Sequence, residues 1–102
     1  GFFRKPWFKQ AFDRQYWDEN PLGKDLYNVF TDHPGEFENS PYFPYYVSAY
    51  AMCAPCEDAA ETFMFFLRYR NSLDRFKKRP GVNKKIKAIQ KAVKKKRREL
   101  GL

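Results

Sequence analysis

The sequence predicts a mainly α-helical chain of a single domain, with three helices and a long aromatic loop. Apolar residues recur at helical spacings in residues 6–19 and 83–99, and residues 56–78 contain neither Gly nor Pro. A chain of 102 residues is long enough for one domain at most. Aromatic residues make up 20% of the chain and supply enough apolar surface for a compact core.

The first helix is predicted over residues 6–19. Pro6 fits the first position of a helix, and the apolar residues that follow share one face: Phe8, Ala11, Phe12 and Tyr16. Pro21 and Gly23 end this helix, because Pro disfavours helical geometry at Asn20 and Gly favours a turn.

A long loop is predicted from residue 20 to residue 44, with a short helix over residues 24–30. The loop is punctuated by proline and glycine. Its aromatic residues predict that it packs against the rest of the chain: Phe37, Tyr42, Phe43, Tyr45 and Tyr46.

The second helix is predicted over residues 56–78, with Ala60, Phe63 and Leu67 on its apolar stripe. Its first two turns are acidic, which suits the positive end of the helix dipole. Pro80 and Gly81 are expected to stop it.

The third helix is predicted over residues 83–99, with Asn83 as its N-cap. A narrow apolar seam steps by four, three and four residues: Val82, Ile86, Ile89 and Val93. Opposite this seam we expect a face of cations: Lys84, Lys85, Lys87, Lys91, Lys94, Lys95, Arg97 and Arg98.

Charge divides the chain in two. Residues 1–62 hold 10 acidic and 5 basic residues, and residues 63–102 hold 15 basic and 2 acidic residues. We therefore expect an acidic, aromatic body over residues 1–81 and a basic amphipathic helix over residues 82–102. Such a helix is either a solvated face or an anion-binding surface for an acidic partner or nucleic acid, as in a small non-enzymatic interaction protein.

One segment of the chain reads Tyr46-Val-Ser-Ala-Tyr-Ala-Met-Cys-Ala-Pro-Cys-Glu-Asp-Ala-Ala-Glu-Thr-Phe63. It resembles the third-ligand helix of gluzincin-type zinc metallopeptidases, including lethal-factor-like peptidases. The shared pattern includes seven residues from Tyr50 to Glu57 and four from Glu57 to Glu61. The resemblance implies that the chain is similar to the C-terminal half of a zincin-like domain.

The resemblance also implies roles for individual residues. The residue matching Glu57 is the carboxylate ligand of zinc, and those matching Glu61 and Asp58 support the site. The residue matching Tyr50 offers its hydroxyl to the oxyanion that forms during peptide hydrolysis. Glu57 and Glu61 are one helical turn apart, so both project from one face.

The chain departs from this family in its histidines. Catalytic zinc needs three protein ligands, and the family takes two from an H-E-x-x-H helix, whereas this sequence has a single histidine, His33. We expect either that the H-E-x-x-H helix lies upstream of Gly1 or on a separate segment, or that the protein is a degenerate relative. Peptide hydrolysis, and the zinc that the family uses, are therefore not expected of this chain alone.

Cys53 and Cys56 leave two further alternatives. A C-x-x-C pair at a helix N-terminus is typical of thiol redox proteins, although neighbouring Glu57 and Asp58 would raise the thiol pKa values. The same cysteines with His33 and Glu57 form a conceivable zinc site. The longest apolar run covers only residues 63–67, so no membrane span is expected.

Overall fold

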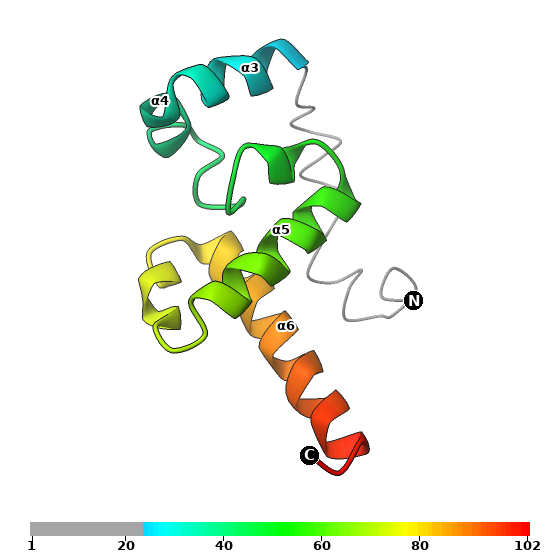
Figure 1. The fold of residues 1–102 in the computed structure, drawn as a ribbon. Coiled ribbons are helices and arrows are strands. Elements are labelled where there is room, and N and C mark those ends of the chain that lie inside the picture. The colour runs from blue at the N-terminus through cyan, green and yellow to red at the C-terminus, as the bar shows by residue number, and fades with distance from the viewer. Residues whose placement is uncertain (1–23) are drawn as a thin grey trace.

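The computed structural model describes residues 24–102, and these form a mainly α-helical fold (Figure 1). Its elements in chain order are α3 (Lys24–Asp32), α4 (Pro34–Glu38), the 3₁₀ helix η2 (Tyr50–Met52), α5 (Pro55–Arg68), the 3₁₀ helix η3 (Leu73–Phe76) and α6 (Pro80–Glu99). The helix predicted over residues 6–19 lies outside the described residues. Within residues 24–102 there is no strand, and no helix has both the length and the apolar character needed to cross a membrane.

The predicted loop contains two helices. The short helix expected over residues 24–30 is confirmed and continues to Asp32 as α3, and α4 follows after His33. Pro34 occupies the first position of α4, where its missing N–H costs no intrahelical hydrogen bond. The two helices meet through Phe30 and Phe37, whose rings lie edge to face with centroids 5.6 Å apart.

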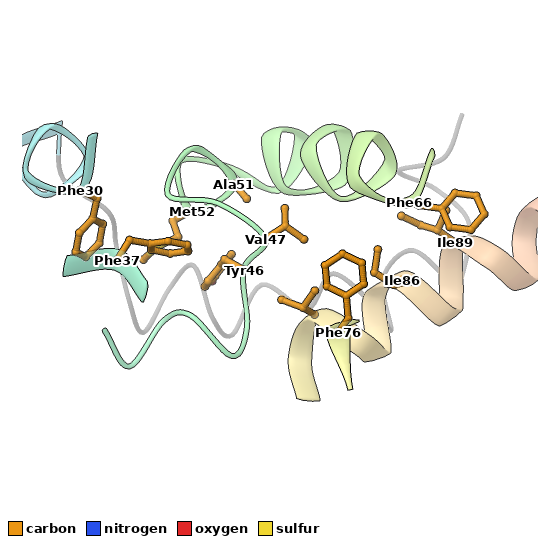
Figure 2. Packing of buried hydrophobic residues seen from close by; sticks show 11 residues of the cluster. Phe30, Phe37, Tyr46, Val47, Ala51, Met52, Phe66, Phe76, Ile86 and Ile89 are labelled. Carbon is orange, nitrogen blue, oxygen red and sulfur yellow. The ribbon is translucent and has the colours of Figure 1, made fainter. Parts of the chain in front are cut away.

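Residues 42–46 follow α4, and we call them the aromatic segment. They pack against the rest of the chain, as predicted. Phe43 lies edge to face against Phe37 at 5.6 Å, and Tyr46 is only 1% exposed. Figure 2 shows that the core extends from Phe30 and Phe37 on one side, past Tyr46, to the residues of α5 and α6 on the other. This segment therefore joins the two ends of one elongated core.

The prediction of a continuous helix over residues 56–78 is wrong at its C-terminal end. The helix α5 stops at Arg68, and the chain turns before η3. Tyr69 packs between Phe65 and Phe76, with both pairs of ring centroids 5.9 Å apart. The turn brings Phe76 into the core at 2% exposure, a gain in apolar burial that a straight helix would forgo.

The apolar stripe predicted for α5 is not the buried face of this helix. The buried residues of this helix are Asp58, Thr62 and Phe66. The side chains of Phe63, Met64 and Leu67 are 38%, 44% and 46% exposed, and Ala60 beside them is exposed. Because residues 63–67 are apolar on every side of the helix, periodicity alone did not identify the buried face. We call Phe63, Met64 and Leu67 the apolar ridge.

The helix α6 begins at Pro80, three residues before the predicted start at Asn83. Pro80 occupies the first position of the helix rather than terminating the preceding one. The predicted seam is confirmed, since Val82, Ile86 and Ile89 are at most 4% exposed and Val93 packs against them.

The start of α6 binds four consecutive backbone carbonyls of the aromatic segment. Arg79 donates hydrogen bonds to the carbonyls of Phe43 and Tyr46, the N–H of Val82 donates to Pro44 at 3.0 Å, and the Lys85 ammonium donates to Tyr45 at 2.7 Å. The Arg79 guanidinium also stacks 3.6 Å from the centre of the Phe43 ring. Burial lowers the pKa of Arg79 to about 10, against the opposing effect of the Glu38 charge, so it stays protonated at neutral pH.

This contact requires a glycine at position 81. A Cβ atom there would lie 2.6 Å from Cδ1 and 2.8 Å from Cα of Tyr45. The backbone of the aromatic segment therefore approaches α6 more closely than any side chain at position 81 would permit.

We expect Gly81→Ala to lower the free energy of unfolding by about 1–3 kcal/mol, because the added methyl group forces the aromatic segment away from α6. Urea denaturation followed by circular dichroism measures this change.

Gly35→Ala is the matched control. It lies in α4, where an added Cβ meets no atom within 4 Å, so it should leave stability unchanged or raise it by up to about 1 kcal/mol. Equal effects of the two substitutions would contradict the close approach at Gly81.

Candidate functional site

A buried ion pair joins α5 to α6. The Lys85 ammonium lies 2.6 Å from the Asp58 carboxylate, and their side chains are 2% and 0% exposed. The Thr62 hydroxyl lies 3.2 Å from the other carboxylate oxygen of Asp58. Lys85 also lies 4.3 Å from the centre of the Tyr46 ring. The network joins Asp58 and Thr62 of α5 to Lys85 of α6 and to the Tyr46 ring, so it fixes how the two helices are placed.

Burial shifts both charged groups toward their neutral forms. It raises the pKa of Asp58 to about 6, although the Lys85 charge and hydrogen bonds from Lys85 and Thr62 act in the opposite direction. It likewise lowers the pKa of Lys85, although Asp58 acts against that shift. Desolvation is thus the larger effect on each group.

The prediction that Lys85 belongs to the exposed cation face is wrong, because its residue is 1% exposed and bound to Asp58. The sequence contains the signal for this. Lys85 lies three residues after Val82 and four before Ile89, which places it on the buried face of α6. On α5, Asp58, Thr62 and Phe66 recur every four residues and so share one face. Asp58 provides the carboxylate that pairs with Lys85.

The two glutamates of the metallopeptidase-like motif lie one turn apart on α5 and are half-buried. Glu61 accepts a hydrogen bond of 2.9 Å from the Ser48 hydroxyl, whose oxygen in turn accepts one of 3.2 Å from the N–H of Ala51. This bridge ties the segment before α5 to the helix itself. Asp58 instead binds Lys85.

Tyr50 is the first residue of η2, which packs against α5. The next two residues, Ala51 and Met52, are buried at 0% and 2% exposure, whereas Tyr50 is 42% exposed. The short helix therefore anchors in the core and presents the tyrosine at the surface.

The cysteines flank the start of α5. Both are exposed free thiols, and the Cys56 sulfur lies 4.0 Å from a carboxylate oxygen of Glu57. Burial, and then the Glu57 charge, raise the pKa of Cys53, which reduces its thiolate fraction. A raised pKa weighs against the redox alternative, because thiolate is the reactive form.

His33 lies in the short connection between α3 and α4 and is exposed. Among the described residues, no group of three or more His, Cys, Asp or Glu side chains is arranged to hold a metal ion. Glu57 supplies the kind of oxygen that zinc accepts, but residues 24–102 supply no pair of imidazoles for a catalytic site.

The remaining predicted cations of α6 are exposed: Lys84, Lys87, Lys91, Lys94, Lys95, Arg97 and Arg98, together with Lys96. The second half of α6 extends away from the other described elements (Figure 1). The cations and the glutamate motif thus belong to different regions of the structure.

No protein-family model, curated protein or solved structure matches this chain.

We expect the Asp58 carboxyl to titrate near pH 6, as followed by carbon-detected nuclear magnetic resonance. Because this pKa is raised above the usual value of 3.8 for an aspartate, the folded state binds the proton more tightly. The contribution of Asp58 to the free energy of unfolding is therefore fully present below pH 3.8 and is lost as the pH rises through about 6.

Thr62→Val should move this midpoint further up, since it removes a hydrogen bond that stabilises the carboxylate. Thr31→Val, on α3, is the control and should leave the midpoint in place. A wild-type midpoint below pH 4 would contradict the dominance of desolvation.

Proposed function

We propose that this chain forms part of a zinc metallopeptidase of the gluzincin type, with its imidazole ligands supplied by another segment. Glu57 is the carboxylate ligand, Glu61 and Asp58 support it, and Tyr50 donates a hydrogen bond to the oxyanion of the substrate carbonyl. The observation that carries this proposal is the hydrogen bond between Ser48 and Glu61.

The Ser48 bridge supports a preorganised arrangement. Ser48 binds Glu61 and the N–H of Ala51 at once, so the turn that bears Tyr50 is tied to the helix that bears both glutamates. A tyrosine has few rotatable bonds, and Tyr50 is 42% exposed. Preorganised donors of this kind stabilise developing negative charge.

The buried ion pair supports the same arrangement from an adjoining face of α5, since Asp58 lies three residues before Glu61. Asp58 binds Lys85 of α6 and Thr62 of its own helix, so α5 has one fixed rotation about its axis. That rotation sets the direction in which neighbouring Glu57 projects. Asp58 therefore supports the site through the orientation of the helix.

The apolar ridge supports the presence of a further polypeptide segment. Phe63, Met64 and Leu67 are exposed on α5, and Met64 lies three residues after Glu61, on the adjoining face. Contiguous exposed apolar surface marks a protein contact. We assign this contact to the segment that carries the two missing histidines, because it would lie against the helix that supplies the third ligand.

The experiment begins with the coding sequence that precedes Gly1, where we expect an H-E-x-x-H motif. In the natural polypeptide, Glu57→Gln should abolish stoichiometric zinc, measured by mass spectrometry, and Glu61→Gln should weaken zinc affinity about 10–100-fold. Tyr50→Phe should lower kcat for peptide hydrolysis about 10²–10³-fold while zinc is retained, since it removes one oxyanion donor.

Asp74→Asn is the matched control, because its side chain is 87% exposed on η3 and should affect neither zinc nor kcat. A natural polypeptide without paired histidines, or one that keeps its zinc in Glu57→Gln, would overturn the proposal.

A further inference from the structure

We infer that α6 binds the phosphate backbone of double-stranded nucleic acid through a cationic stripe on its exposed face. The stripe consists of Lys84, Lys87, Lys91, Lys94, Lys95 and Arg98, all of which are exposed. This inference is independent of the proposed peptidase role and concerns a different region of the chain.

The stripe is straight and dense. At about 100° per residue its six cations fall within an arc of about 100°, centred opposite the buried seam of Val82, Ile86 and Ile89. From residue 84 to residue 98 the helix rises about 21 Å, so the six cations lie about 4.2 Å apart along the helix axis on average, at steps of one to four residues. One strand of a DNA duplex carries one negative charge per about 3.4 Å along the helix axis.

The charges of the stripe are not neutralised within the described part of the chain. The ion pairs of residues 24–102 are Lys77 with Asp74 and Lys85 with Asp58, and neither involves the stripe. Glu99 is the sole acidic residue in α6. The whole stripe is therefore available to displace counterions from a polyanion.

The end of the helix keeps the stripe in helical geometry. Gly101, with φ of 74°, allows the N–H of Leu102 to bind the carbonyl of Arg97 at 2.8 Å and its own N–H to bind that of Arg98 at 3.1 Å. These bonds cap the last turn of α6. The cations thus project from a formed helix that extends away from the other described elements (Figure 1).

Two other polyanions fit less well. A helix that binds a membrane surface needs a free apolar face, but the apolar face of α6 is covered, with Val82 at 0% and Ile86 at 1% exposure. An acidic protein presents carboxylates only where its own sequence places them. A duplex presents its phosphates at a regular spacing in every sequence.

The experiment measures binding of the full chain to a labelled 20-base-pair DNA duplex of mixed sequence by fluorescence anisotropy between 20 and 200 mM NaCl. Six phosphate contacts give a slope of about −5 for log K against log salt concentration. The quadruple variant Lys91→Gln, Lys94→Gln, Lys95→Gln and Arg98→Gln should reduce the slope to about −2 and weaken binding at 50 mM NaCl more than tenfold. Gln is a good helix former, so circular dichroism should be unchanged.

The matched control removes the same number of exposed charges away from the stripe: Arg68→Gln, Arg70→Gln, Lys77→Gln and Lys78→Gln. It should keep the slope near −5. An equal loss in both variants would overturn the inference, since net charge alone would then explain binding. Tighter binding to phosphatidylserine vesicles, or equal competition by polyglutamate, would also overturn it by assigning the stripe to lipid or to an acidic protein.

Discussion

The fold depends on how an irregular aromatic segment satisfies its backbone carbonyls. Residues 43–46 lie against α6 without helical hydrogen bonds to their own carbonyls, and a buried carbonyl without a partner is costly. Arg79, the N–H of Val82 and Lys85 supply donors to four successive carbonyls. This need explains why two cations lie inward at the start of α6 and why position 81 has no side chain.

The same contact links the elements that carry the two candidate sites. Lys85 binds a carbonyl of the aromatic segment and the carboxylate of Asp58 with one ammonium group. Asp58 belongs to α5, next to Glu57, while Lys85 belongs to the helix that carries the cationic stripe. A single buried charge therefore relates the orientation of α5 to that of α6, although the two surfaces have different chemistry.

Much of the fold could be predicted because periodicity and proline are local signals. The seam of α6 follows from periodicity, and the packing of the aromatic segment follows from its aromatic residues. The end of α5 and its buried face could not, because residues 63–67 are apolar on every side and the turn after Arg68 is favoured by the burial of Phe76. At the candidate site, the spacing of Glu57 and Glu61 follows from the sequence, whereas the partner of Asp58 lies 27 residues away. Lys85 was misplaced because a cation is ordinarily solvated, and only its position among Val82, Ile86 and Ile89 indicates otherwise.

The apolar ridge also bears on how this chain behaves in solution. With a net charge of +8, separate copies repel one another at low ionic strength. Added salt shortens the reach of that repulsion to about 10 Å at 0.1 M, while attraction between Phe63, Met64 and Leu67 of neighbouring molecules is not screened. Colloidal stability of the isolated chain should therefore decline as salt increases, and dilute buffers of low ionic strength are the conditions that favour a monomer.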